Sequence, residues 1–444
     1  MESSPRTCET RQLKESPFSK FNRLSILIGP MIDPSMFATV VFVLVLLKCG
    51  AEFCLERLNR NHVGAHSSVV PKAFRGLMDD ATYGKSVQYT LAKSRLNQFE
   101  SFYDAAVLLG ALFGGGLPWA FTACEAAFGA SAWSMGLFVF GAVLALSLTG
   151  LPFDWYAQFH LEDRFGFNTT TARLWWTDRL KGLLLAVVLA YPLTVLILKL
   201  VEWTGTHWWL WAWGTVLAFQ LLMIVLAPTL ILPLFNRFSP LPEGSLRNRL
   251  QALAERLKFP LQRIEVMDGS KRSRHSNAFF TGFGRTRKVV LFDTLAQQLT
   301  EAEMEAVLAH EIGHYKKGHV PKMLIWNATC LLIGFYAVAW LASRPWFLQA
   351  FGFAPGPIAP ALLLFVLLAG VLTFWLSPVV NAFSRRYEFE ADTFAARALG
   401  DAEPLIGALR KLNEKNLSNL TPHPLYSRFY YSHPALLERE AALS

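Results

Sequence analysis

The chain has 444 residues, of which 53% are hydrophobic, 14% aromatic and only 17% charged. Soluble globular domains carry about 25% charged residues, so this composition excludes an ordinary soluble enzyme and indicates a membrane protein. The formal net charge of +9 lies largely in segments that flank apolar stretches, which favours attraction to anionic lipid over binding to nucleic acid.

The first 30 residues are polar and rich in serine, proline and charged residues, which predicts a flexible tail. They lack the uninterrupted apolar core and the small-residue cleavage site of a signal peptide. We therefore expect the first apolar stretch, which follows this tail, to remain in the protein as a membrane anchor.

Seven apolar stretches are near the length that is needed to cross a bilayer. They lie at 35–55, 101–123, 132–154, 179–201, 208–234, 323–343 and 358–382. Pro228 and Pro233 interrupt the end of the fifth stretch and are expected to kink or stop its helix. The pattern predicts seven transmembrane helices.

Lysine and arginine gather in alternate connections between these stretches, at 56–100, 155–178, 236–322 and 384–444. The positive-inside rule places these four segments in the cytoplasm and the N-terminus on the other side of the membrane. Five basic residues before the first stretch favour the opposite orientation: Arg6, Arg11, Lys14, Lys20 and Arg23. We follow the six later connections over this one segment.

Two cytoplasmic segments, 236–322 and 384–444, are long enough to form one composite domain outside the membrane. In the first, Leu246 to Leu257 predicts a helix, and strands are predicted at Ile264–Val266, Phe279–Phe280 and Val289–Phe292. Gly282 and Gly284 suit the connection of a hairpin between the last two strands. Such a hairpin is either scaffold only or an exposed edge to which an extended peptide adds as another strand.

The sequence His310-Glu311-Ile312-Gly313-His314 lies on a predicted helix of about 300–317, which begins with a capping box of Thr300 and Glu303. Residues four apart share a helix face, so both histidines can hold one zinc ion while Glu311 reaches its bound water. This geometry indicates hydrolysis. In the alternative interpretation, both histidines are ordinary residues of an amphipathic helix.

A catalytic zinc site usually has three protein ligands, so a third must come from elsewhere. The longer motif HExxHxxGxxH is excluded, because Lys317 and Val320 occupy its glycine and histidine positions. Glu388 and Asp392 share a helix face, whereas Glu390 points away from them. Glu388 can therefore bind the metal while Asp392 orients a histidine. Alternatively, these acids pair with Arg385 and Arg386 on a solvated face.

At this point the chain resembles the CAAX prenyl protease 1 family of integral-membrane zinc metalloproteases, whose members cut prenylated proteins near their C-terminus. The resemblance covers about residues 36–442. It rests on several separate segments in order: Phe165-Gly166-Phe167-Asn168 with Thr170, Pro233-Leu234-Phe235-Asn236, His275-Ser276-Asn277-Ala278-Phe279, Leu291-Phe292-Asp293-Thr294-Leu295, His310 to His314, Glu388 to Asp392, and Ser432-His433-Pro434 followed by Arg439.

The resemblance implies a mainly α multi-pass membrane fold, with seven helices around an intramembrane chamber and a small α+β metalloprotease domain on the cytoplasmic side. It implies the following site: zinc ligands His310, His314 and Glu388; the general base Glu311; Asp392 behind the ligands; Asn277 and Ala278 on the strand that aligns the peptide; and His433 and Arg439, which contact the substrate carbonyl or support the site. His433 is the candidate donor to the oxyanion.

Combined with the predicted spans, this divides the chain into five regions: 1–30 (tail), 31–235 (helices 1–5), 236–322 (N-terminal protease segment), 323–383 (helices 6–7) and 384–444 (C-terminal protease segment). We expect a monomeric zinc endopeptidase with one Zn²⁺ per chain, in a bacterial cytoplasmic or ER membrane. Its substrates are expected to be peptides or proteins, prenylated or not. Two alternatives are a quality-control protease with non-prenylated substrates and, in another class, a channel or transporter.

Overall fold

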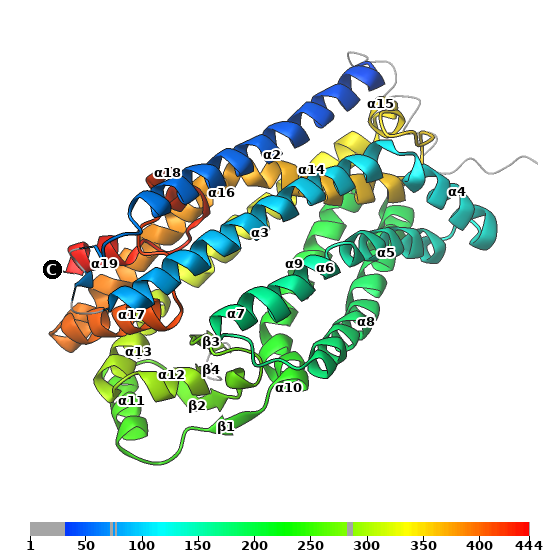
Figure 1. Ribbon diagram of the computed structural model, residues 1–444. Helices are drawn as coiled ribbons and strands as arrows, with labels where there is room; N and C mark the ends of the chain where they lie inside the picture. Colours follow the sequence, from blue (N-terminus) through cyan, green and yellow to red (C-terminus); the bar gives the residue numbers. More distant parts are fainter. Residues whose placement is uncertain (1–31, 72–73, 76–77, 282–286, 444) are drawn as a thin grey trace, which may run out of the picture.

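The structure is a computed structural model that describes residues 32–71, 74–75, 78–281 and 287–443. The predicted tail at 1–30 and the hairpin connection with Gly282 and Gly284 lie outside the described residues. Long helices dominate the described part, and a small sheet lies at one end beneath them (Figure 1). The longest are α2 (Pro34–Ala65), α3 (Asp80–Phe113), α8 (Ala172–Thr204), α14 (His319–Ala342) and α16 (Ile358–Leu399).

Two predicted spans are bent and not straight. The stretch 101–123 was expected to form one helix, but α3 ends at Phe113 and the chain turns by 52° into α4 (Gly116–Phe128). Gly115, at φ +74, makes this turn, because a residue with a side chain is strained in the left-handed region. The stretch 132–154 bends by 40° between α5 (Ala132–Leu148) and the helical segment Leu151–Phe165.

That second segment comprises α6 (Leu151–Tyr156), a π-helical turn (Ala157–Glu162) and α7 (Asp163–Phe165). Another π-helical turn, Ala227–Ile231, contains Pro228 and joins α9 (Trp208–Leu226) to α10 (Leu232–Phe235). The helical path therefore continues through Pro228 and Pro233, with an irregular hydrogen-bond pattern at Pro228. A π-helical turn accommodates proline because it alters the hydrogen-bond ladder that the missing N–H would break.

By length and composition, four helices in the described part of the chain can cross a membrane, or up to six if each bent pair is one span. One of the four is the whole run Ala172–Phe235. This run includes α8 and α9, which a 3-10 turn at Gly205–His207 separates and which pack against each other. Helices α2, α14 and α16 are three further candidates. They contain the predicted stretches 35–55 and 358–382 and all but the last residue of 323–343.

Residues 238–292 contain a four-stranded sheet in the order β1-β2-β4-β3. Its strands are β1 (Phe238–Pro240), β2 (Leu261–Met267), β3 (Ala278–Thr281) and β4 (Arg287–Phe292). The three strands expected from the sequence are present, and β1 is an additional one. β2 and β4 are parallel, whereas β3 pairs antiparallel with β4 and has one open edge.

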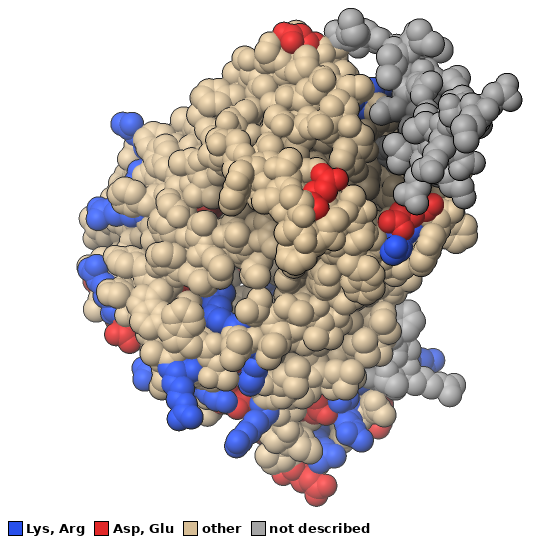
Figure 2. Space-filling view, turned by 90° about the vertical axis from the view of Figure 1, so that its right-hand side faces the viewer, with Lys and Arg blue, Asp and Glu red and all other residues tan. Residues whose placement is uncertain are grey.

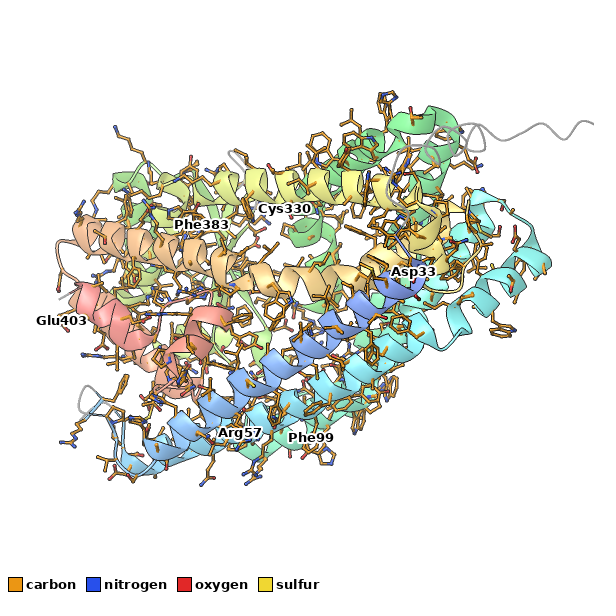
Figure 3. All side chains as sticks on the ribbon, turned by 90° about the horizontal axis from the view of Figure 1, so that it is seen from above. Asp33, Arg57, Phe99, Cys330, Phe383 and Glu403 are labelled. Atoms are coloured by element: carbon orange, nitrogen blue, oxygen red, sulfur yellow. The ribbon has the colours of Figure 1, made fainter. Side chains whose placement is uncertain are left out.

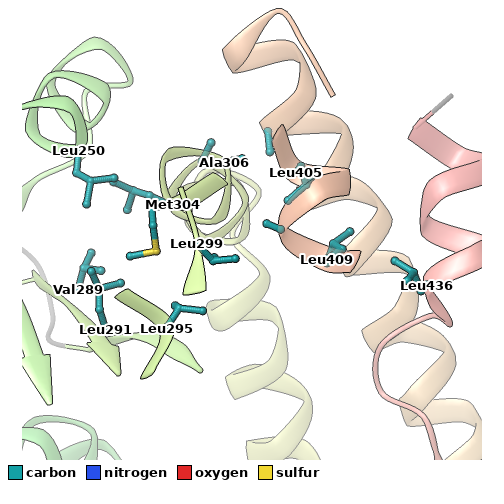
Figure 4. Close-up of a cluster of buried hydrophobic side chains, with 14 of the residues drawn as sticks. Leu250, Val289, Leu291, Leu295, Leu299, Met304, Ala306, Leu405, Leu409 and Leu436 are labelled. Carbon is teal, nitrogen blue, oxygen red and sulfur yellow. The ribbon is translucent and has the colours of Figure 1, made fainter. Parts of the chain in front are cut away.

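Five helices pack beside the sheet or beside one another. They are α11 (Ser245–Arg256), α12 (Asp293–Gln298), α13 (Glu301–Lys316), α17 (Glu403–Lys415) and α19 (Leu436–Leu443). Their apolar faces share one buried cluster. Figure 4 shows Leu250 of α11, Val289 and Leu291 of β4, Met304 of α13 and Leu405 of α17 within it. This packing brings residues 405–436 together with residues 250–304, although α14 and α16 lie between the two segments in the sequence. Two short helices complete the fold, α15 (Pro345–Gln349) and α18 (Pro424–Tyr430).

The charged side chains mark one end of the molecule. Lys and Arg gather on the lower part of the surface in Figure 2, at the height of α11 and β1 in Figure 1, while the part above is largely uncharged. Viewed from above, Asp33 at the start of α2 and Glu403 at the start of α17 lie at opposite ends, with Cys330 of α14 between them (Figure 3).

Candidate metal centre

Helix α13 carries the motif at 310–314 and begins as the sequence predicts. The side chain of Thr300 accepts a hydrogen bond from the backbone N–H of Glu303, and the Glu303 carboxylate accepts one from the backbone of Thr300. This capping box satisfies two backbone donors that a helix start would otherwise leave unpaired. The helix then packs closely against α16. A Cβ atom on Gly313 would lie 3.1 Å from the backbone Cα and O atoms of Ala391, so glycine permits this close approach.

Three side chains from α13 and α16 converge at this crossing. Nε2 of His310 lies 3.4 Å from Oε2 of Glu388, and Nε2 of His314 lies 3.3 Å from Oε1 of the same carboxylate. The two Nε2 atoms are 3.2 Å apart. One ligand atom from each residue lies within 4.8 Å of the others. The three residues that the sequence and the resemblance single out as ligands are thus brought together.

Asp392 and Arg439 lie behind His310. The carboxylate of Asp392 is 2.8 Å from Nδ1 of His310, and it accepts two hydrogen bonds from the Arg439 guanidinium, at 2.8 and 2.5 Å. Burial lowers the pKa of His310, but the facing carboxylates of Asp392 and Glu388 outweigh burial and raise it to about 9. A metal ion that binds Nε2 must therefore displace a proton.

The structure differs from the alternative in which Glu388 and Asp392 pair with Arg385 and Arg386 on a solvated face. Arg386 pairs with Glu390 at 3.0 Å, and Arg385 donates to the backbone carbonyls of Arg428 and Tyr431. Glu388 and Asp392 are both buried, with exposed fractions of 5% and 1%. They face α13, as their common helix face predicts.

His319 is a candidate positioning residue that the sequence reasoning missed. Its Nδ1 lies 3.0 Å from Nδ1 of His314, its Nε2 lies 3.1 Å from Glu390, and its ring stacks on Tyr387 at 4.3 Å. It is 1% exposed. The sequence pattern gives neither residue a role. His319 is out of register for the third histidine of the longer motif, and Glu390 is on the helix face away from Glu388 and Asp392. The signal that was available is a histidine five residues after His314, next to a glycine that ends the helix.

Glu311, the predicted base, directly follows His310 on α13. Burial raises the pKa of Glu311, while the neighbouring His310 and His314 oppose that rise. Glu311 and residues 278–280 of β3 line the same small cavity. Glu311 therefore lies near β3, the edge strand of the sheet.

The remaining predicted residues lie around this centre. Nε2 of His433 is 3.4 Å from Oε1 of Glu388, and the His433 side chain is 65% exposed, so it is open to a substrate. Arg439 is buried and is held by Asp392. His433 and Arg439 also line a cavity of about 850 Å³. Asn277 is exposed at the start of the edge strand β3, and Ala278 is its first residue.

The donor set fits a divalent metal ion. Oε2 of Glu388 is buried and makes no hydrogen bond within the described residues, although it faces His310 and Arg439. A bound cation would satisfy this oxygen. Two imidazoles and one carboxylate are the ligand set typical of hydrolytic zinc sites such as His₂Glu. Tetrahedral zinc would keep its fourth position for water or substrate.

Comparison with known proteins agrees with this site and fold. Residues 59–237 match the model of the CAAX prenyl protease N-terminal domain with five membrane helices, and residues 240–444 match Peptidase family M48. A CAAX prenyl protease 1 homolog from Arabidopsis thaliana is 36% identical over 93% of this chain and 98% of its own length. CAAX prenyl protease 1 of Saccharomyces cerevisiae is also 36% identical, over 84% of this chain and 88% of its own length.

A solved structure extends the likeness to three dimensions. The crystal structure of S. mikatae Ste24p matches with a TM-score of 0.87 and 32% identity, and the match covers 94% of this chain and 100% of that one. The fold and the site therefore define a multi-pass membrane metalloendopeptidase, which sets aside the channel or transporter alternative. The chain belongs to the CAAX prenyl protease 1 family.

Proposed function

We propose that this protein is a zinc endopeptidase that cleaves prenylated proteins near their C-terminus. The observation that carries the proposal is the convergence of His310, His314 and Glu388, with Glu311 on the same helix as the two histidines and lining a cavity with the edge strand β3. The prenylated substrate class comes from the names of relatives that match nearly the whole chain. The quality-control alternative would keep the chemistry but use substrates without a prenyl group.

In this proposal His310, His314 and Glu388 hold the zinc ion. Asp392, supported by Arg439, fixes the ring of His310 through Nδ1. Bound zinc would supply Lewis acidity, which polarises a carbonyl and makes water more acidic. A substrate segment would add along β3 through Asn277 and Ala278, so that its backbone is held in an extended conformation.

The chain's own residues would then move the protons. Glu311 would accept a proton from the attacking water, and its raised pKa brings it closer to that of a base that works near neutral pH. The same carboxyl would pass the proton to the leaving amine. His433 is exposed beside Glu388 and would donate a hydrogen bond from its ring to the developing oxyanion.

The arrangement in the membrane also belongs to the proposal. We infer seven spans, because α8 and α9 each have the length of a span and pack against each other, while the bent pairs supply two more. We further infer that the spans enclose a chamber, that the metal site faces the cytoplasm and that the protein acts as a monomer. The basic residues at the sheet end support this orientation by the positive-inside rule. An ER or bacterial cytoplasmic membrane would suit it.

The test compares prenylated and unprenylated peptides of one sequence with the native protein and with Glu311→Gln. We expect the native protein to prefer the prenylated peptide and Glu311→Gln to lose cleavage of both by about 10²–10⁴-fold. Glu311→Gln should retain one zinc ion by metal analysis. A matched control is Glu301→Gln, on the first turn of the same helix and outside the site, which should cleave normally.

Two outcomes would contradict separate elements of the proposal. Cleavage retained by Glu311→Gln would refute the role of this residue as the base. Equal cleavage of both peptides by the native protein would favour the quality-control alternative.

A further inference from the structure

The segment Ser270–Ser276, which leads into the edge strand β3, is held by the membrane half of the protein. Arg272 donates to both carboxylate oxygens of Asp178 on α8, at 2.8 and 3.1 Å. It also donates to the side-chain oxygen of Asn236 and the backbone carbonyl of Phe235, each at 2.7 Å. One guanidinium thus joins α8 and the end of α10 to this segment.

Backbone pairing adds to that contact. The carbonyl of Arg272 accepts hydrogen bonds from Thr169 and Thr170, and the N–H of Arg274 donates to the carbonyl of Phe167 at 3.0 Å. Asn168 and Ser273 form an isolated antiparallel bridge. Residues 167–170, between α7 and α8, therefore lie alongside residues 272–274 like a short strand.

His275 completes the connection two residues before Asn277. Its ring stacks on Phe167 at 4.0 Å, and its nitrogens lie 3.2 Å from Glu162 and from Asn416. Glu162 ends the π-helical turn 157–162 and also accepts a hydrogen bond of 2.6 Å from Tyr89 on α3. Such irregular turns inside helices frequently re-aim side chains at functional sites.

These contacts account for two of the segments that carry the family resemblance and that the chemistry does not use. Phe167 and Asn168 belong to the segment 165–168, and Phe235 and Asn236 belong to the segment 233–236. Both converge on residues 272–275, and none of the four touches the metal site. They meet where the edge strand begins.

We propose that Arg272 and His275 are positioning residues that fix the substrate-aligning edge of β3 against the membrane helices. The proposal rests on the proposed peptidase function, because it gives β3 the task of holding a peptide. A peptide that adds to this edge meets the metal site correctly only if the strand is fixed to within a fraction of an ångström. A misplacement of about 1 Å can cost roughly 10²-fold in rate.

The experiment uses the full chain with Arg272→Gln, Arg272→Lys and Asp178→Asn. One substrate is a peptide long enough to lie along β3, and the other is a blocked dipeptide amide that is too short to pair with it. We expect Arg272→Gln and Asp178→Asn to lower kcat/KM for the long peptide at least about tenfold, mainly through KM, and to leave the short one within about twofold. Zinc content should stay at one per chain.

A second readout is independent of activity. Hydrogen exchange of the backbone amides in Ala278–Thr281 should become about tenfold faster or more in Arg272→Gln and Asp178→Asn. Matched controls are Arg179→Gln and Asp154→Asn, which break an exposed ion pair of 2.7 Å that also joins α8 to a neighbouring segment. The controls should change neither measurement. Arg272→Lys, which keeps the charge but loses the two-pronged contact, should be intermediate.

The outcomes separate this proposal from the proposed function. Equal losses for the long and short peptides, or unchanged exchange with unchanged cleavage of the long peptide, would overturn the positioning role. If the native protein cleaves neither peptide, the proposed function fails, and the exchange measurement still decides whether Arg272 fixes β3. Should Arg272→Gln fail to fold, Asp178→Asn and Arg272→Lys give the same comparison.

Discussion

The two histidines of the candidate metal site have different supports. Nδ1 of His310 faces the carboxylate of Asp392, which Arg439 holds, whereas Nδ1 of His314 faces the ring of His319. In each case the second ring nitrogen is committed to a partner, which leaves Nε2 to face Glu388. The partner of a ligand histidine fixes which nitrogen carries the proton and how the ring is oriented.

His319→Ala should therefore weaken zinc binding about 10–100-fold, because the ring of His314 loses its partner. Glu390→Gln should have a smaller effect in the same direction, since it acts through His319. The measurement is zinc retention in a competition with a chelator. His207→Ala, which replaces an exposed histidine just after α8, is the matched control and should bind zinc normally. Native affinity in His319→Ala would show that the contact is only packing.

At the scale of elements, the crossing of α13 and α16 sets the distance between the ligands. The two histidines lie on α13 and Glu388 lies on α16, and Gly313 is the point of close approach. Helices can approach closely where a glycine presents no side chain. A larger residue there must separate the helices and hence His310 and His314 from Glu388.

Gly313→Ala tests this crossing. In an isolated helix, alanine is more favourable than glycine by about 0.8–1.0 kcal/mol, but here its Cβ would meet the backbone of Ala391. We expect a roughly tenfold loss of zinc affinity with the helix content retained, measured by competition and circular dichroism. Gly182→Ala on α8, where nothing lies within 4 Å, should bind zinc normally. Equal affinities for both variants would refute the argument.

The start of α13 is also a contact between elements. Glu303 closes the capping box, accepts a hydrogen bond of 2.7 Å from Lys411 on α17 and lies against Gly407. Burial raises the pKa of Glu303, but hydrogen bonds from Lys411 and Thr300 lower it more, so its net pKa is below the ordinary value. A group whose pKa is depressed in the folded state stabilises it above the unfolded pKa and loses that effect as the pH falls.

We expect Glu303→Gln to lower Tm by about 2–4 °C at pH 7, as the loss of about 1–2 kcal/mol would produce. The difference from the native protein should shrink as the pH falls from about 4.5 through the depressed pKa. Thermal unfolding of both proteins between about pH 7 and pH 3 measures this. A difference that grows towards low pH would contradict the sign.

At the scale of the whole molecule, the proposed orientation turns on whether α8 and α9 each cross the membrane. If they do, three spans separate the turn at 129–131 from residue 243, and the two positions lie on opposite sides. If Ala172–Phe235 counts as one span, only two separate them, and they lie on the same side.

Single cysteines at Ala130 and Glu243, in a chain whose five native cysteines are replaced by serine, distinguish these cases. Both positions are exposed. In sealed membrane vesicles with the cytoplasmic face outward, we expect a membrane-impermeant maleimide to label Glu243→Cys directly and Ala130→Cys only after permeabilisation. Labelling of both from one side would refute the seven-span count, and the reverse pattern would refute the orientation.

Local signals predicted the features of this protein that depend on local chemistry. Helix α13, its capping box, three of the four strands and the meeting of His310, His314 and Glu388 follow from spacing, turn residues and the resemblance. Strand β1 was missed because three residues with two exposed side chains carry no alternation. The bend after Phe113 was missed because hydropathy alone joins 101–123 into one stretch, although Gly114-Gly115-Gly116 and Pro118 within it are turn signals.

Contacts between distant segments could not be predicted in the same way. Glu390 and His319 are 71 residues apart, and Arg272 and Asp178 are 94 apart. Each pair depends on how membrane helices pack, which a single sequence does not encode as a local pattern. From the sequence alone, a polar residue whose partner is distant in the chain is expected to face solvent.

Helix α16 runs without interruption from Ile358 in the apolar region to Leu399, through Pro378, and Glu388 lies on it. At 1.5 Å per residue, this helix is about 60 Å long, and Glu388 lies about 15 Å beyond Pro378. A hydrophobic segment that is longer than the bilayer is thick tilts to fit it. If α16 tilts independently of α13, Glu388 would move relative to the two histidines, and we would then expect zinc retention to depend on the acyl-chain length of the surrounding lipid.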